Sequence, residues 1–251
     1  LLSPTLNQPI AMAYVQAEYA QPGTEVVRTS SRGMFWLEPL VELHLPDGGR
    51  TGFAAVTPAE VPALLAAAST PSTGTDSRGD GTAYGPGEVT GRAIERVDEH
   101  PFLARQTRIT CRRLGVIEPA SLADYERHGG LVGLRRALQL APTAVVEEVV
   151  ASGLRGRGGA GFPTGVKWRT VAATESDVRF VCANADEGDS GTYADRMLME
   201  GDPFALLEGM AIAAYAVGAT EGFVYIRSEY PHAIAAMERA LVVARAGGWL
   251  G

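Results

Sequence analysis

The order of hydrophobic and polar residues in the first part of the chain predicts a small α/β unit. Residues 41–45 alternate between aliphatic and polar side chains, which is the pattern of a half-buried strand. Turn residues at 46–49 separate this strand from the apolar segment 51–56, so the two are expected to pair as a hairpin. Residues 25–28 are expected to form another strand, and residues 11–20 a short helix.

A long polar segment then interrupts the hydrophobic pattern. Thr57-Pro58-Ala59-Glu60 has the order of a capping box and predicts a helix whose apolar face begins at 61–65. Farther on, 16 of the 23 residues in 69–91 are Gly, Pro, Ser or Thr. Such a segment has little to bury, so we expect a flexible linker over residues 69–94.

The pattern after the linker is helical at first. Residues 95–152 are expected to form a mostly helical segment. Within it, residues 131–140 have apolar side chains at helical spacing, and Pro142-Thr143 opens a further helix that runs to Ser152.

The last hundred residues alternate between strands and helices. Strands are predicted at 179–183 and 222–227, each followed by a helix, at 203–218 and from Ser228 to Gly247. The order strand, helix, strand, helix implies a parallel sheet with right-handed crossovers, and the fold class is therefore α/β. Cys182 lies in the first of these strands and is expected to be a buried structural thiol.

Composition and charge narrow the function classes. The 251 residues include 22 basic and 29 acidic side chains, and the net charge of −7 argues against nucleic acid and membrane surfaces as partners. The most apolar stretch, 204–219, is interrupted by Glu208, so we expect a buried helix and no direct membrane insertion. The start Leu1-Leu2-Ser3-Pro4 has no basic leader, which makes the cytoplasm the expected location. Cys111 and Cys182 lack metal-binding spacing, and no metal site is expected.

The strongest candidate for ligand binding is the Gly-rich segment, residues 153–168. It reads GLRGRGGAGFPTGVKW, and six of its first 13 residues are glycine. Glycine lets backbone amides approach a ligand closely, and Pro163 and Thr164 predict a helix directly after the loop. This arrangement is typical of a phosphate or dinucleotide site. The segment matches neither the Walker A pattern nor the ordinary dinucleotide fingerprint.

A second candidate follows the strand at 179–183. Residues 184–191 read NADEGDSG, with three carboxylates in four residues. They stand at the carboxyl end of a predicted parallel strand, where ligands of open α/β sheets bind. A ribose diol or a bound cation would use these carboxylates, and a solvated acidic turn is the alternative.

These residues resemble the flavin-binding subunit of NADH dehydrogenases. The family includes the NADH-binding subunit of respiratory complex I, the diaphorase subunit of NAD-reducing hydrogenases and the beta subunit of soluble NAD-dependent formate dehydrogenases. The resemblance is carried by the Gly-rich segment, by Asn184, Asp186 and Glu187, and by Tyr225-Ile226-Arg227-Ser228-Glu229-Tyr230.

Two features favour the formate dehydrogenase beta subunit within this family. The acidic loop reads Glu187-Gly188-Asp189-Ser190-Gly191, where complex I subunits more often read E-[GS]-E-P-G. Residues 31–39 resemble the thioredoxin-like domain fused to that beta subunit, with Ser31 and Phe35 where cluster-binding relatives carry the cysteines of C-x-G-x-C. Because a [2Fe–2S] cluster needs thiolates, we expect residues 1–68 to be a thioredoxin-like domain without iron–sulfur ligands.

The resemblance implies an incomplete Rossmann-like FMN-binding domain over residues 153–251, in which a hydride passes between a nicotinamide and FMN. Glu187 is the expected catalytic residue, and Phe162 is expected to stack on a ring of the nucleotide. Thr170 departs from relatives that carry an aromatic residue there. The resemblance assigns Gly156, Arg157, Gly158, Lys167, Asn184, Asp186 and Glu187 to the FMN site, and Gly159, Phe162 and Asp189 to the NAD site.

The resemblance also implies partners and a cofactor outside this chain. FMN and NAD are the expected cofactors, and a [4Fe–4S] cluster is expected only in a C-terminal part that this sequence lacks. The expected partners are a formate dehydrogenase catalytic subunit and a small [2Fe–2S] subunit, with electron transfer coupled to formate oxidation. Because the predicted sheet is only part of a doubly wound sheet, we expect the 251-residue chain to be a fragment or a degenerate copy, inactive alone.

Two alternatives remain at this point. The first is the corresponding subunit of complex I or of an NAD-reducing hydrogenase. The second, from another class, is a non-catalytic docking module that keeps the N-terminal unit and a partial sheet without binding FMN.

Lys167 is the single lysine among the 22 basic residues, and it lies in the Gly-rich segment. We predict that Lys167→Arg weakens flavin or nicotinamide binding in the complete protein, because a planar guanidinium does not replace a compact ammonium in a tight pocket. Dissociation constants for FMN and NADH measure the effect. Unchanged affinity and turnover would refute a specific role for this ammonium.

Overall fold

The computed structural model describes residues 12–16, 27–44, 50–68, 92–94, 96–189 and 191–251. They belong to two compact units, Leu1–Val116 and Ile117–Gly251. The first contains a mixed sheet and the second a parallel sheet, which confirms the α/β fold class. The boundary between the units lies inside the segment 95–152.

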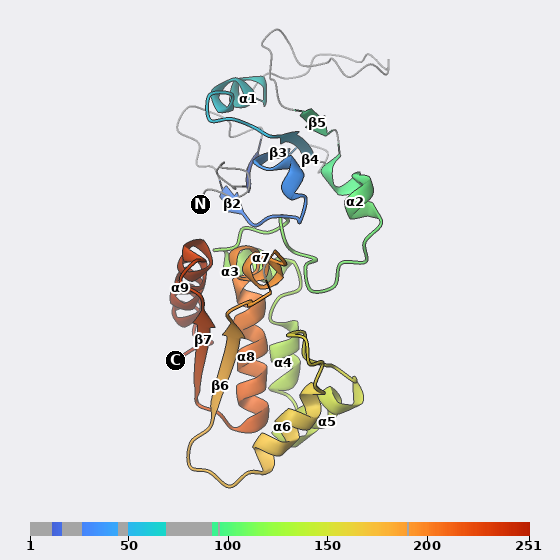
Figure 1. Cartoon of the computed structure of the whole chain (residues 1–251). Helices are drawn as coiled ribbons and strands as arrows, with labels where there is room; N and C mark the ends of the chain where they lie inside the picture. Colours follow the sequence, from blue (N-terminus) through green and yellow to red (C-terminus); the bar gives the residue numbers. More distant parts are fainter. Residues whose placement is uncertain (1–11, 17–26, 45–49, 69–91, 95, 190) are drawn as a thin grey trace. The chain divides into compact units, whose positions relative to one another are not determined.

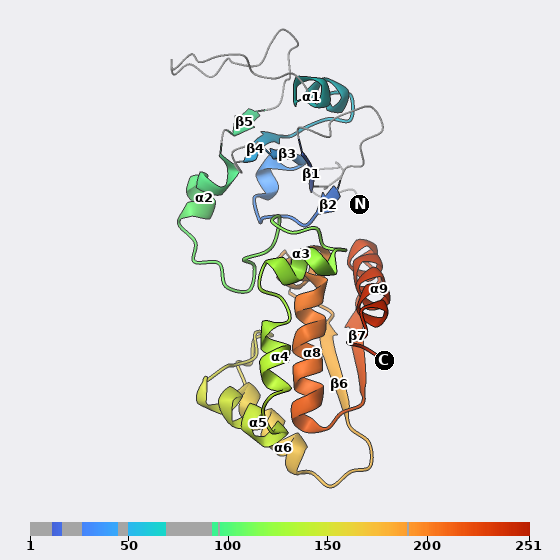
Figure 2. The same cartoon turned by 180° about the vertical axis from the view of Figure 1, so that it is seen from behind.

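The first unit contains a five-stranded sheet in the order β2-β1-β3-β4-β5 (Figures 1 and 2). β1 runs parallel to β3, and the other neighbouring strands are antiparallel. The hairpin expected from the alternation at 41–45 is confirmed, with Val41 opposite Phe53. The strands are β1 (Met12–Gln16), β2 (Val27–Thr29), β3 (Leu40–His44), β4 (Arg50–Ala54) and β5 (Arg92–Ile94).

The expected helix over residues 11–20 is wrong in its described part, where Met12–Gln16 forms β1. Hydrogen bonding to β2 on one side and β3 on the other favours an extended chain, and this tertiary pairing outweighs local helix propensity. The predicted turn at 46–49 and residues 69–91 of the expected linker lie outside the described residues, whereas the last three residues of the linker expected over 69–94 form the strand β5.

The helix α1 (Val61–Ala68) follows the expected capping sequence. Glu60 Oε2 accepts hydrogen bonds from the Thr57 N–H and from the Thr57 hydroxyl, each over 2.7 Å. Glu60 therefore reaches back as a capping box requires. The Thr57 hydroxyl donates to Glu60, whereas the capping sequence predicts that it accepts from a first-turn amide.

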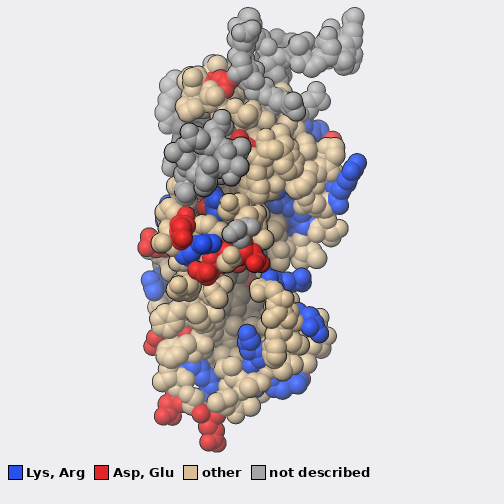
Figure 3. Space-filling view, viewed as in Figure 1, with Lys and Arg blue, Asp and Glu red and all other residues tan. Residues whose placement is uncertain are grey.

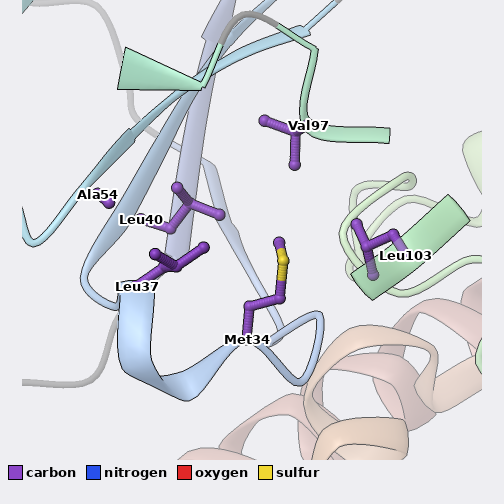
Figure 4. Packing of buried hydrophobic residues seen from close by; sticks show 6 residues of the cluster. All are labelled: Met34, Leu37, Leu40, Ala54, Val97 and Leu103. Atoms are coloured by element: carbon purple, nitrogen blue, oxygen red, sulfur yellow. The ribbon is translucent and has the colours of Figure 1, made fainter. Parts of the chain in front are cut away.

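Residues from both sides of the segment 69–91 share one hydrophobic cluster in the first unit (Figure 4). Val97, in the 3-10 turn η3 (Val97–Glu99), and Leu103, in α2 (Pro101–Ala104), belong to it. These two side chains therefore help to bury the sheet and the 3-10 turn η2 (Phe35–Leu37). The cluster contains Met34, Leu37, Leu40, Ala54, Val97 and Leu103.

A buried ion network lies beside this cluster. Arg32 is 3% exposed; its Nη1 donates to Asp98 over 2.6 Å, and its Nη2 donates to Glu42 over 3.0 Å. Burial raises the pKa of Glu42 although Arg32 and Arg50 oppose the shift. Burial alone would also raise the pKa of Asp98. The hydrogen bond and the charge of Arg32 outweigh burial, so the pKa of Asp98 is lowered. The Arg32 guanidinium also donates to the Gly115 carbonyl over 2.9 Å, so it links the sheet to a distant loop.

The second unit is built around α8 (Pro203–Val217), the helix expected over 203–218 (Figures 1 and 2). The helix ends at Gly218 in the left-handed conformation, φ 72°, as a C-terminal glycine predicts. Among the described residues, no helix combines the length and apolarity needed to cross a bilayer. Besides the sheet, α8 contacts α4 (Val132–Ala137), α5 (Pro142–Ala151), α6 (Thr164–Ala173), α7 (Ala194–Gly201) and α9 (Pro231–Ala246).

Two parallel strands, β6 (Phe180–Ala185) and β7 (Glu221–Ile226), confirm the predicted parallel sheet. One face, with Val181, Val224 and Ile226, lines a cavity of about 530 Å³ beside α8 and α9. The opposite face is exposed: Phe180 is 53% exposed and Phe223 54%. The prediction of a buried Cys182 is therefore wrong, because the described residues leave this face of the sheet open.

Two helix starts differ from expectation. α7 was not predicted from the sequence, and it precedes α8 directly at the buried Asp202. α9 begins at Pro231, with Tyr230 in the N-cap position, so Ser228 does not cap it.

A buried carboxylate, Glu208, explains the acidic residue within the apolar helix α8. Its Oε1 accepts from the Leu134 N–H over 2.9 Å, and its Oε2 accepts from the Leu131 N–H over 2.8 Å. The Tyr125 hydroxyl of α3 (Leu122–Arg127) also donates to Oε2. Leu131 has φ 59°, so this left-handed residue and the start of α4 are held by a side chain of α8.

We predict that Glu208→Ala lowers the free energy of unfolding by about 3 kcal/mol, because two buried amides and a buried hydroxyl lose their acceptor. Urea denaturation measures the change. Glu238→Ala, on an exposed position of α9, is the control and is expected to change stability by less than about 0.5 kcal/mol. Equal losses in both variants would contradict the assigned role of Glu208.

Candidate functional site

The Gly-rich segment forms a closed loop between α5 and α6. The Gly156 N–H donates to the Phe162 carbonyl over 2.9 Å, and the Thr164 N–H donates to the Leu154 carbonyl over 2.9 Å. These bonds join the two ends of the loop, and the tip at 157–160 is exposed. The loop therefore presents free backbone at a fixed position ahead of a helix.

The exposed tip of the loop favours glycine at two positions, Gly158 and Gly159. Gly159 has φ 100°, a value that side-chain-bearing residues rarely adopt. A Cβ at Gly158 or Gly159 would meet nothing within 4 Å, so the backbone there faces open space. The predicted helix start is confirmed by α6 at Thr164, and its first N–H groups favour an anion.

A third glycine, Gly165, sets the position of α6. A Cβ built on Gly165 would lie 2.6 Å from the backbone nitrogen and Cα of Val150. α6 therefore approaches α5 closely at the point where the loop ends. The contact fixes the direction in which the loop leaves α5.

Phe162 and Lys167 flank the start of α6. Phe162 is 51% exposed, and Lys167 Nζ lies 6.0 Å from its ring centroid, at the limit of a cation–π contact. Both side chains are available to a ligand. Arg157 and Thr170 are exposed as well, and the Thr170 hydroxyl donates to the Val166 carbonyl over 2.9 Å.

The acidic residues follow the carboxyl end of β6, as expected. Asn184, on the exposed face of the strand, accepts from the Asp186 N–H through its side-chain oxygen over 3.2 Å. This Asx turn directs the chain out of the sheet. Asp186 is half-buried and Asp189 is exposed, and the Asp189 carbonyl accepts from the Thr192 hydroxyl over 2.9 Å.

Glu187 is held from several directions. Its Oε1 accepts from the Asp195 N–H over 2.9 Å, and its Oε2 from the Arg196 N–H over 3.2 Å, both in the first turn of α7. The same carboxylate contributes to raising the pKa of the Tyr230 hydroxyl, so these two groups interact. Arg227 Nη1 donates to the Glu187 carbonyl over 2.9 Å.

Burial and the charge on Glu187 affect two neighbouring groups. Burial, followed by repulsion from Glu187, raises the pKa of Asp195. Burial and the hydrogen bond to Glu187 raise the pKa of Tyr230. Several acidic groups therefore interact with one another at the end of β6.

The two candidate segments lie on the same side of the second unit. In both cartoon views the Gly-rich loop lies beside α4, at the level of the carboxyl end of β6 (Figures 1 and 2). Figure 3 shows charged side chains of both signs over the end of β6 and a hollow beside them. The loop and the acidic strand end thus belong to one unit and face one region of its surface.

Three residues of this site, Arg227, Tyr230 and Arg196, were not assigned to it from the sequence. The register of the two strands would have indicated them. Because Ala185 pairs with Ile226, the residues that follow β6 and those that follow β7 leave the sheet at the same place. That register depends on a parallel pairing between strands about 40 positions apart in sequence, as the contact from Arg227 to Glu187 shows.

The positions compared with cluster cysteines lie in the first unit. The Ser31 hydroxyl accepts from the Gly33 N–H over 2.9 Å and donates to Glu38, and Phe35 opens the turn η2. Within the described ranges, no group of three or more His, Cys, Asp or Glu side chains is placed to hold a metal ion.

The loop, the helix start and the acidic strand end define an α/β unit with the parts of a nucleotide site. Residues 149–248 match the family model described as the Nuo51 FMN-binding domain. The matched range includes both candidate segments, which supports FMN as the cofactor of this unit.

Curated relatives agree with this match. The chain is 49% identical over 147 residues to the HndC subunit of the NADP-reducing hydrogenase of Solidesulfovibrio fructosivorans, covering 59% of this chain and 30% of that protein. It is 48% identical over 144 residues to an NADH-quinone oxidoreductase subunit of Rhizobium meliloti, and this match covers 57% of this chain and 34% of that protein. It is 48% identical over 118 residues to the alpha subunit of the NAD-reducing hydrogenase HoxS of Cupriavidus necator, covering 47% and 20%. The chain therefore spans about a third or less of the length of these relatives.

We predict that Gly165→Ala destabilises the second unit by about 2 kcal/mol, because the added methyl group collides with the backbone of Val150. Gly158→Ala is the matched control, since its methyl group would enter open space and the free energy of unfolding should stay the same. Urea denaturation of both variants measures the difference. A Gly165→Ala variant as stable as Gly158→Ala would contradict the close helix contact.

Proposed function

We propose that this chain carries the flavin- and nicotinamide-binding part of an oxidoreductase subunit that passes a hydride between NAD(H) and FMN. The observation that carries the proposal is the FMN-binding-domain match over residues 149–248, which includes both the Gly-rich loop and the acidic end of β6. The names of the relatives support NAD(H)-linked electron transfer.

The residues fit FMN in their chemistry. The exposed backbone at Gly158 and Gly159 and the start of α6 suit a phosphate, with positive charge from Arg157 and Lys167, and Gly156 closes the loop that presents them. The side chains of Asn184 and Asp186 are acceptors for the hydroxyl groups of the ribityl chain. Bound FMN supplies a ring that accepts two electrons as a hydride and releases them singly.

The same loop has a surface that suits NAD. The half-exposed ring of Phe162 is a platform on which a nucleotide ring stacks, and the Gly159 backbone beside it is unobstructed. Asp189 is exposed and acidic, which suits a ribose diol. The division into FMN and NAD residues follows the resemblance residue by residue.

We propose that the physiological complex is a cytoplasmic, NAD-dependent formate dehydrogenase. The support is the acidic loop with Asp189 and the segment 31–39, in which Ser31 and Phe35 take the place of cluster cysteines. The partners would be the formate dehydrogenase catalytic subunit and a small [2Fe–2S] subunit, and a [4Fe–4S] cluster would belong to sequence beyond these 251 residues. The hydrogenase and NADH-quinone oxidoreductase relatives define the alternative.

The exposed outer face of β6 and β7 supports a second candidate for the 251 residues taken alone. In that candidate the chain would act as a docking or assembly module that binds no flavin.

We predict that the complete gene product is yellow, releases FMN on denaturation and reduces dyes with NADH, whereas the isolated 251 residues are colourless and inactive. Flavin absorbance and NADH-dependent dye reduction measure both. A complete product that stays colourless after incubation with FMN would contradict the flavin assignment and favour the docking module. Copurification with a formate-oxidising subunit separates formate dehydrogenase from the hydrogenase alternative.

A further inference from the structure

The polar groups of Glu187, the expected catalytic residue, form hydrogen bonds with other groups of the protein. Its carboxylate accepts hydrogen bonds from two N–H groups of α7, and its carbonyl accepts one from Arg227. A carboxylate accepts about four hydrogen bonds, and the Thr192 hydroxyl lies 3.2 Å from Oε1. Little of this carboxylate is left for a ligand.

The backbone of Glu187 is in the left-handed region, with φ 49°. A glutamate seldom adopts this conformation, and it persists only where the surrounding contacts enforce it. Gly188 and Asp189 follow directly, so the conformation of Glu187 decides where the rest of the acidic loop lies.

The contacts that enforce it come from the end of β7 and the start of α9. Tyr230 is 7% exposed, and the guanidinium carbons of Arg227 and Arg196 lie 5.4 and 5.8 Å from its ring centroid. Arg196 is itself held by Glu200, with Nε 3.0 Å from its carboxylate. The Tyr230 ring is thus fixed by two cations, and its hydroxyl interacts with Glu187.

We propose that Arg227 and Tyr230 are positioning residues for the flavin and nicotinamide site. They hold Glu187 in its left-handed conformation and so set the shape of the acidic loop at 186–189. Glu187 shares this role, because its carboxylate anchors the loop to α7. The inference rests on the proposed function, since that loop carries Asp186 and Asp189.

Amide hydrogen exchange of the 251-residue chain tests the contacts without any flavin. Arg227→Gln removes the bond to the Glu187 carbonyl, and Tyr230→Phe removes the hydroxyl that interacts with the Glu187 carboxylate, so the Asp195 and Arg196 amides are expected to exchange about tenfold faster. Arg239→Gln, on an exposed position of α9, is the matched control and should leave these amides unchanged.

FMN affinity of the complete flavoprotein tests the consequence. Arg227→Gln is expected to raise the dissociation constant about tenfold, and Arg227→Lys to restore part of the loss, because an ammonium still donates to the Glu187 carbonyl. The KM for NADH should rise more than kcat falls, since a displaced loop weakens binding.

Exchange rates and FMN affinities indistinguishable from wild type in both Arg227→Gln and Tyr230→Phe would overturn the proposal. Faster exchange with unchanged FMN affinity would overturn it too, because the contacts would then not serve the site. If the wild-type protein binds no FMN, the proposed function fails and the site assignment with it, while the exchange rates still decide whether these side chains hold the loop.

Discussion

The parallel pairing of β6 with β7 is the constraint on which the candidate site depends. Its register places Ala185 opposite Ile226, so that two chain segments leave the sheet at the same edge. From there Arg227 reaches the carbonyl of Glu187, and Glu187 reaches the first turn of α7. A shift of this register would separate the acidic loop from the side chains that hold it.

Behind the sheet, α8 provides the rigid support that a binding loop requires. It packs against α4, α5 and α6, and the buried carboxylate of Glu208 holds the start of α4. The Gly-rich loop leaves from α5 and enters α6, and Gly165 keeps those two helices in close contact. The exposed loop tip is therefore mounted on well-packed helices, which is the arrangement expected of a preorganised site.

Patterns of neighbouring residues predicted the helices and strands whose bounds depend only on neighbouring residues. The helix from Pro203 to the terminating Gly218 and the two strands of the second unit follow from periodicity and end signals, and the positions of both candidate segments follow from those strands and helices. The strand nature of Met12–Gln16 was missed because it depends on pairing with β2 and β3. The bond from Leu131 to Glu208 joins residues 77 positions apart, and no local pattern encodes it. The exposure of Cys182 depends on what covers the sheet, which a single strand pattern does not reveal.

The Gly-rich loop and the end of β6 are proposed to form one FMN site, and this is the central claim. The most direct test is an NMR titration of the 251-residue chain with FMN, followed through backbone amide signals. We expect saturable shifts that occur together at Gly156, Gly158 and Asp186, because both segments contact the same ligand, at an affinity too weak for the isolated chain to retain FMN during purification. Shifts confined to one of the two segments, or to the first unit, would contradict the claim.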